Sequence, residues 1–269
     1  MFDLTGKAAI VTGGASGLGL AFVEILTEQG ASVTILDMDA AALDTEVARL
    51  RSDGKDVRGE VLDVTDRQAL DDAFDRAASL HGGLDILFAN AGIDPGPGFM
   101  SFSERSQRLP EHAIERYEDG RWHRVISVSL DAVFYSIRAA SRHMKTRQGG
   151  RIIVTTSISA VRPAPGVGAA YMAAKAGAAH LVRTAALELA RYNVLVNAIA
   201  PGPFFTNIAG GRMHDAEQRA LMAKAVPLHR VAHPDEIKGV ALLLASPAGS
   251  FITGEQIVVD GGTSLGSVD

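Results

Sequence analysis

Short apolar runs alternate along the chain with longer stretches in which apolar residues recur at helical spacing. The short runs predict buried strands at 8–11, 32–36, 57–62, 86–89, 152–155, 195–199 and 256–259. The longer stretches predict helices that include 18–28, 41–51, 67–80, 122–144 and 172–191. Strands that alternate with helices are typical of a parallel sheet covered on both faces, so we predict a doubly wound α/β (Rossmann) fold.

No linker or shift in composition divides the chain, so we expect a single domain over 1–269. Its cofactor half is expected at about 1–150 and its catalytic and substrate half at about 151–269. Two segments, 93–120 and 202–230, break the alternation where strands end. Ligands of open α/β sheets bind beyond the carboxyl ends of the strands, so both segments are candidate substrate loops. The alternative is an ordinary surface insertion.

The composition argues against several classes of protein. The formal net charge is -5 and no cluster of Lys or Arg is present, so a nucleic-acid partner is not expected. The apolar run at 8–11 is far too short to cross a bilayer, and no membrane association is expected. The chain has 0 Cys and its 8 His are scattered, so we expect neither disulfide nor metal site, and a cytoplasmic location fits.

A glycine-rich turn follows the first predicted strand and opens the first predicted helix. Glycine at these positions lets the backbone turn tightly and approach a pyrophosphate at the positive end of the helix. The turn therefore predicts a dinucleotide site that includes Gly13, Ser16, Gly17, Leu18 and Gly19. It lacks the Lys that a nucleotide-triphosphate loop requires after its last glycine.

Asp37 ends the second predicted strand. A carboxylate there can accept hydrogen bonds from the adenosine ribose hydroxyls and would repel a 2′-phosphate. No Arg or Lys lies between Gly13 and Gly19 to offset that repulsion, so we expect NAD in preference to NADP. The alternative is an aspartate that merely starts a turn, since Asp39 lies beside it.

Tyr171 and Lys175 are four residues apart on a predicted helix, so their side chains can share one face. An ammonium beside a phenol favours the ionised phenol, whose pKa is ordinarily near 10. Such a pair suits proton transfer to or from an alcohol oxygen at neutral pH.

These features, in this order, resemble the short-chain dehydrogenase/reductase family, in its single-domain branch, over nearly the full length. The matching motifs are Thr12-Gly13-x-x-x-Gly17-x-Gly19, Asp63-Val64, Asn90-Ala91-Gly92, Ser157, Tyr171-x-x-x-Lys175, Pro201-Gly202 with Thr206, and Val259-Asp260-Gly261-Gly262. The resemblance implies an enzyme that moves a hydride between a secondary alcohol and a nicotinamide cofactor, and it implies a homotetramer.

The resemblance also implies roles for single residues. Tyr171 would be the general acid/base, and Ser157 would hold the substrate oxygen, with Ser159 as the reserve because the spacing to Tyr171 is one residue longer than usual. The residues beside the cofactor would be Asp63, Val64, Asn90, Ala91, Gly92, Pro201, Gly202 and Thr206, together with Tyr171 and Lys175. The alternative for Thr12 and Asn90 is that they only tie neighbouring strands together.

Ser129 departs from the family pattern, because a catalytic asparagine usually occupies that position. The asparagine is thought to kink the helix and hold a water that links the lysine to solvent. A serine hydroxyl can bond back within its own helix and still offer an oxygen to that water. We therefore expect an active enzyme with an altered proton relay.

The substrate is less well defined than the chemistry. Apolar residues after Ser157 and in the second loop, among them Phe204 and Phe205, indicate a mainly apolar pocket for a ring-bearing or aliphatic secondary alcohol. Arg162, Arg212 or His112 can hold a carboxylate, but surface solvation is the favoured role for each. An NADPH-dependent reductase similar to 3-oxoacyl reductases is the second candidate function, and a catalytically weak dinucleotide-binding sensor or scaffold is the third.

Overall fold

The computed structural model describes residues 1–93, 96–101, 107–206, 208 and 215–266. Its strands are β1 (Ala8–Thr12), β2 (Ser32–Asp37), β3 (Val57–Val61), β4 (Ile86–Ala89), β5 (Gly150–Thr155), β6 (Val194–Pro201) and β7 (Gln256–Val259). Its α-helices are α1 (Gly17–Glu28), α2 (Ala40–Ser52), α3 (Arg67–His81), α4 (Asp119–Ile126), α5 (Ala132–Arg147), α6 (Ala169–Leu189), α7 (Ala216–Lys224) and α8 (Lys238–Ala245).

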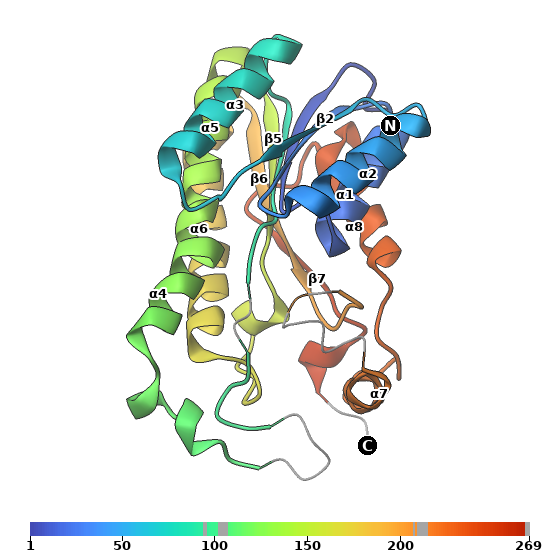
Figure 1. Ribbon diagram of the computed structural model, residues 1–269. Helices are drawn as coiled ribbons and strands as arrows, with labels where there is room; N and C mark the ends of the chain where they lie inside the picture. Colours follow the sequence, from blue (N-terminus) through green and yellow to red (C-terminus); the bar gives the residue numbers. More distant parts are fainter. Residues whose placement is uncertain (94–95, 102–106, 207, 209–214, 267–269) are drawn as a thin grey trace.

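The strands form one parallel sheet in the order β3-β2-β1-β4-β5-β6-β7. Helices α3, α5 and α6 cover one face, and α1, α2 and α8 cover the other (Figure 1). Neighbouring residues of one strand serve opposite faces, as Ile10 and Val11 do, because side chains alternate along a strand. The doubly wound fold is confirmed, and the predicted strand ends differ from the observed ones by at most two residues.

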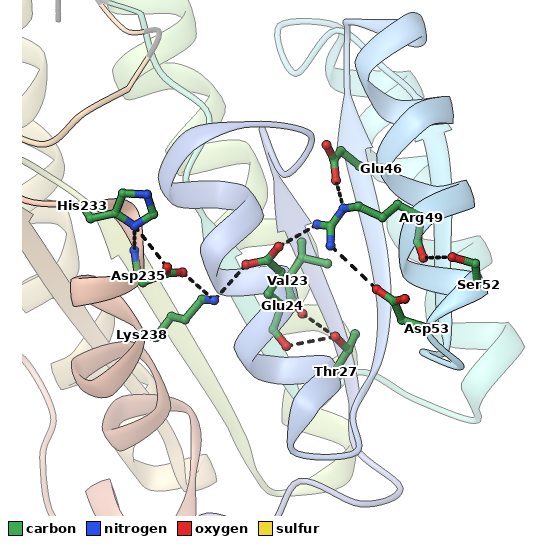
Figure 2. Close-up of polar contacts among 10 residues, drawn as sticks. All are labelled: Val23, Glu24, Thr27, Glu46, Arg49, Ser52, Asp53, His233, Asp235 and Lys238. Carbon is green, nitrogen blue, oxygen red and sulfur yellow. Dashed lines mark hydrogen bonds and ion pairs between the residues drawn. The ribbon is translucent and has the colours of Figure 1, made fainter. Parts of the chain in front are cut away.

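Glu24 of α1 forms ion pairs with α2 and α8, the other two helices on its face of the sheet. Its carboxylate bridges Arg49 of α2 at 2.6 Å and Lys238, the first residue of α8, at 2.8 Å (Figure 2). Lys238 also meets Asp235 at 2.6 Å. Charges in a network restrain one another better than an isolated surface pair does, so this cluster ties the start of α8 to α1.

The predicted helix 122–144 begins earlier than expected and is interrupted. Helix α4 begins at Asp119, a π-helical turn covers Ser127–Asp131, and α5 continues to Arg147. One extra residue in such a turn displaces the helix register, and turns of this kind are frequent at functional sites. Ser129 lies in the middle of it and is fully buried.

The two segments that break the alternation lie at the end of the molecule where the strands finish, as the 107–118 segment and α7 show (Figure 1). Parts of both predicted loops, including Arg212, lie outside the described residues. The second segment contains α7. Among the described residues, no helix has both the length and the apolar content needed to cross a membrane.

Phe204 is not placed as its assignment to the substrate pocket required. Its side chain is only 5% exposed and belongs to the apolar core between the sheet and α1 and α8. The backbone around Phe204 is held by a bridge to Ala232, in which the Phe205 N–H donates to the Ala232 carbonyl oxygen at 2.9 Å. We therefore reassign the Phe204 side chain from substrate contact to the core. An aromatic residue in a loop can be drawn inward by the same hydrophobic gain that buries a strand residue.

Candidate active site

The glycine-rich turn is built by close approach of the chain to itself. Gly13 and Gly17 have φ of 64° and 55°, in the left-handed region that favours glycine. A Cβ on Gly19 would overlap the Gly13 carbonyl oxygen and come within 2.6 Å of Asn90 Nδ2. The Ser16 side chain does not cap α1, so among the described residues no side chain caps the first N–H groups of that helix. This cradle fits a pyrophosphate, which such N–H groups bind.

Asp37 lies beside that cradle. Its Oδ2 accepts a hydrogen bond from the Ala15 N–H at 2.9 Å, and its Oδ1 accepts one from Asp39 N–H at 3.1 Å. A carboxylate can accept more than two hydrogen bonds, so these two bonds orient Asp37 and leave its oxygens able to accept others. Asp63-Val64 follows the end of the next strand, β3, and the Asp63 carboxylate accepts hydrogen bonds from the N–H and hydroxyl of Thr65 in the turn there.

Asn90 joins three strands. Its Nδ2 donates to the carbonyl oxygens of Thr12 and Gly13 at 3.1 and 3.0 Å, and its Oδ1 accepts from Thr155 Oγ1 at 3.0 Å. The Thr12 hydroxyl in turn accepts from the N–H groups of Asn90 and Ala91. The side chains of Thr12 and Asn90 therefore tie neighbouring strands together.

Lys175 is a buried cation. Its side chain is 2% exposed, and Nζ donates to the Thr155 carbonyl oxygen at 2.7 Å. Burial lowers the pKa of Lys175 to about 8, because the charged form loses hydration. Nζ also lies 5.6 Å from the centre of the Tyr171 ring, as the four-residue spacing on α6 predicts. The pair therefore shares a face of the helix, beside the end of β5.

Ser157 comes two residues after the end of β5, in a buried position. Its Oγ accepts a hydrogen bond from the Ser159 N–H at 3.1 Å, so the hydroxyl starts the short turn Ile158–Ala160. That turn packs on α6, which carries Tyr171. Ser157 is more deeply buried than Ser159, and its hydroxyl proton remains to be donated.

Ser129 does not bond back within its helix. Its Oγ donates to the carbonyl oxygen of Ile93 and accepts from the Ile93 N–H, both at 3.2 Å. A Cβ on Gly92 would stand 3.2 Å from Lys175 Nζ and 3.6 Å from Ser129 Oγ. The Ser129 hydroxyl and the Lys175 ammonium thus border the same small space beside Gly92. The Ser129 hydroxyl also holds the backbone of Ile93, the residue after Gly92.

The residues after β6 approach the glycine-rich turn. Gly202 packs so closely on β7 that an added Cβ would lie 2.5 Å from Asp260 Cβ, and its N–H donates to Val259. A Cβ on Gly17 would lie 3.4 Å from the Thr206 methyl carbon. The chain therefore returns from Pro201 to the start of α1. Phe205 lines a hollow of about 350 Å³ beside α1, rather than the Ser157 turn.

Arg162 is exposed and lies just beyond the Ser157 turn, where its N–H donates to Ile158. Its guanidinium donates to the carbonyl oxygens of Thr263 and Ser264 at 3.1 and 3.4 Å. These acceptors are neutral, so the Arg162 guanidinium forms no ion pair with a carboxylate among the described residues.

Two residues that support the site, Thr155 and Ile93, were not predicted from the sequence. Thr155 supplies both the carbonyl that holds Lys175 and the hydroxyl that holds Asn90, while Ile93 supplies the partner of Ser129. The position of Thr155 at the end of a central strand was a usable signal. Ile93 acts through its backbone, which no side-chain pattern reveals.

Comparisons with known proteins agree over nearly the whole chain. Residues 13–264 match a family model described as Enoyl-(Acyl carrier protein) reductase. Cis-4-hydroxycyclohexanecarboxylate dehydrogenase of Sinomonas cyclohexanicum is 38% identical, over 95% of this chain and 96% of its own. Gluconate 5-dehydrogenase of Gluconobacter oxydans is 31% identical, over 98% and 97%. The crystal structure of a gluconate 5-dehydrogenase from Burkholderia cenocepacia in complex with NADP and tartrate superposes with a TM-score of 0.86, at 31% identity over 98% and 97%.

The buried ammonium predicts a pH-dependent stability. Because the folded pKa of Lys175 is about 8 and the ordinary value is 10.5, the unfolded chain holds the proton more tightly. Lys175 therefore makes the free energy of unfolding rise as pH increases from about 8 to 10.5, by up to about 3 kcal/mol. Denaturant unfolding of wild type and Lys175→Met should be measured over this pH range. The rise in the free energy of unfolding with pH that Lys175 causes should appear in the wild type and be absent from Lys175→Met. Parallel curves would contradict the burial of a titrating ammonium.

Proposed function

The chain belongs to the short-chain dehydrogenase/reductase family and is an oxidoreductase that acts on CH–OH groups, and we propose that it oxidises a ring-bearing or aliphatic secondary alcohol with NAD. The observation that carries this proposal is the buried Lys175 ammonium beside the Tyr171 ring. We further propose that 1–150 holds the adenosine side of the cofactor and that 151–269 supplies the catalytic groups.

In this proposal Tyr171 accepts the proton of the alcohol. Lys175 favours the phenolate through its charge, and the Thr155 carbonyl fixes the ammonium so that it cannot turn away. Ser157 donates its hydroxyl proton to the substrate oxygen and holds it against Tyr171, which contributes orientation as well as charge stabilisation. The nicotinamide, when bound, supplies the acceptor for the hydride.

The preference for NAD rests on Asp37. Its carboxylate stands beside the glycine-rich turn, where ribose hydroxyls would donate to it and a 2′-phosphate would be repelled. The gluconate 5-dehydrogenase structure was solved with NADP, so the choice of cofactor needs its own experiment. We propose that Gly13, Ser16, Gly17, Leu18 and Gly19 hold the pyrophosphate, and that the other cofactor contacts are Asp63, Val64, Asn90, Ala91, Gly92, Pro201, Gly202 and Thr206.

The substrate is proposed to carry a carboxylate. Two of the relatives are named for hydroxy acids, one with a cyclohexane ring and one a sugar acid. Arg162 offers a guanidinium just beyond the Ser157 turn whose described partners are neutral carbonyls. A charged guanidinium is the side chain best suited to hold a carboxylate.

The chain is further proposed to form a homotetramer in the cytoplasm, as its family resemblance and its cysteine-free sequence suggest. Large apolar side chains are exposed on α5 and α6 (Phe134 and Leu187) and around β7 (Phe251 and Val258). Two separate apolar faces suit two kinds of contact between copies of the chain. Light scattering on the native protein tests the assembly, and a monomer at micromolar concentration would contradict it.

The choice of cofactor can be read from fluorescence titrations with NADH and NADPH. Wild type should bind NADH more tightly, and Asp37→Ala should weaken NADH binding by about 10- to 100-fold, the loss expected for hydrogen bonds to a charged group. Asp39→Ala is the matched control and should leave the NADH affinity nearly unchanged. Tighter NADPH binding by wild type would favour the NADPH-dependent reductase instead.

The carboxylate can be tested by comparing an acid with its ester. With cis-4-hydroxycyclohexanecarboxylate, Arg162→Gln should raise KM by about 10-fold or more, because a charge-assisted contact is lost. With the methyl ester the same substitution should change KM little. Arg58→Gln, an exposed arginine on β3, is the control. An equal effect on acid and ester would remove Arg162 from carboxylate recognition.

Ser129 is proposed to replace the usual asparagine in the proton route from Lys175. Ser129→Asn should then shift the pH profile of kcat, and Ser129→Ala should lower kcat by about 10-fold or more. Ser136→Ala serves as the control, since among the described residues that buried hydroxyl bonds only within α5, to the Ala132 carbonyl oxygen at 2.8 Å. An unchanged pH profile and kcat in both Ser129 variants would exclude a role in the relay. Cofactor binding without turnover of any alcohol would favour the sensor or scaffold.

A further inference from the structure

The chain between β4 and α4 makes a long excursion, which we define by its described residues, 96–101 and 107–117. Its first part runs antiparallel to 165–167, the segment that leads into α6. Gly98 N–H donates to Gly166 O at 3.0 Å and Met100 N–H donates to Pro165 O at 3.1 Å. The excursion then doubles back, with Leu109 N–H bonded to Phe99 O at 2.8 Å. A small ribbon is therefore attached to the chain between Ser157 and Tyr171.

Gly98 makes this attachment close. A Cβ there would overlap the Pro165 carbonyl oxygen and lie 2.5 Å from the Val167 carbonyl oxygen. Both contacts are with backbone, which cannot swing aside as a flexible side chain can. The excursion is thus fitted to the 165–167 segment at backbone distance, and a change in one displaces the other.

Arg121, on the first turn of α4, clamps the excursion from the other side. Its NH2 donates to Pro97 O at 2.9 Å, and its NH1 lies 2.9 Å from His112 Nδ1. The guanidinium also stacks 4.9 Å from the centre of the Tyr117 ring. One side chain thereby holds the beginning and the end of the excursion together, through two hydrogen bonds and one stacked ring.

The clamp reaches the start of the catalytic helix. A Cβ on Gly168, the residue before α6, would stand 3.2 Å from the Tyr117 hydroxyl and 3.5 Å from Arg121 NH2. Tyr117 and Val167 also pack in the same apolar cluster as Tyr171. Apolar side chains of the excursion, Phe99 and Ile114, are exposed at this end of the molecule. The excursion therefore packs beside Tyr171 through Tyr117, and it also carries exposed apolar side chains.

We propose that the excursion forms the wall of the substrate pocket that receives the apolar body of the alcohol, and that Arg121 is the positioning residue that sets this wall. The inference rests on the proposed function, because it assumes that the alcohol reacts at Tyr171. It assigns Arg121 no contact with the reacting atoms. Arg121 acts by holding the excursion against 165–168, which fixes the distance between the wall and Tyr171.

Amide hydrogen exchange tests the positioning without reference to activity. Arg121→Met keeps an unbranched side chain but removes both hydrogen bonds, so exchange at the Gly98 and Met100 amides should accelerate by about 10-fold or more. Arg116→Met is the matched control, since Arg116 is an exposed arginine of the same excursion. Arg121→Lys should fall in between, because one ammonium cannot reproduce the planar fork. Unchanged exchange in Arg121→Met, with circular dichroism confirming folded protein, would overturn the proposal.

Steady-state kinetics test whether the wall binds the apolar body of the alcohol. For 4-hydroxycyclohexanecarboxylate, Arg121→Met should raise KM by about 10-fold or more while kcat changes by less than about threefold, because apolar binding surface is lost and not the chemistry. For the smallest secondary alcohol that wild type oxidises, KM should stay within about twofold. An equal rise in KM for both alcohols, or a fall in kcat alone, would overturn the claim that the wall binds the apolar body of the alcohol. If wild type oxidised no alcohol, the proposed function would fail, while the exchange result would still decide whether Arg121 sets the excursion.

Discussion

The buried ammonium of Lys175 is the constraint on which the site depends. A charge that is 2% exposed needs a strong partner, and the Thr155 carbonyl supplies it at 2.7 Å. Thr155 also donates its hydroxyl to Asn90, and Asn90 donates to the Gly13 carbonyl. One chain of hydrogen bonds therefore runs from α6 across β5, β4 and β1 to the glycine-rich turn. It fixes Lys175, the proposed partner of Tyr171, relative to the turn that we propose holds the cofactor.

Sheet register makes this chain of bonds possible. Thr12 pairs with Ala89, and Ala89 pairs with Val154, so the three strands end side by side. Side chains that follow these strands must meet beyond the carboxyl edge, where ligands of this fold bind. Ser129 and the excursion approach from the α4–α5 side, through the backbone of Ile93 and through Arg121. The proposed proton-transfer groups and the proposed substrate wall thus lie at one edge of the sheet and come from separate parts of the chain.

The sequence predicted what depends on local pattern. Strands follow from short apolar runs, the cradle from glycine spacing, and the shared face of Tyr171 and Lys175 from helical periodicity. Phe204 was misplaced because a ring in a loop can turn toward either the pocket or the core, and only the packing of α8 decides. The partner of Ser129 and the attachment of the excursion were not predictable, because both use backbone groups that the sequence does not distinguish.

The most direct test of this account is the pH dependence of the hydride-transfer rate, measured in single turnovers of an oxidised alcohol. The wild-type rate should rise with pH and level off with an apparent pKa well below 10, the ordinary value of a phenol. Removing the charge in Lys175→Met should move that pKa toward 10, and Tyr171→Phe should lower the rate by about 10²- to 10⁴-fold. The same apparent pKa in wild type and Lys175→Met would contradict the claim that the buried ammonium tunes Tyr171.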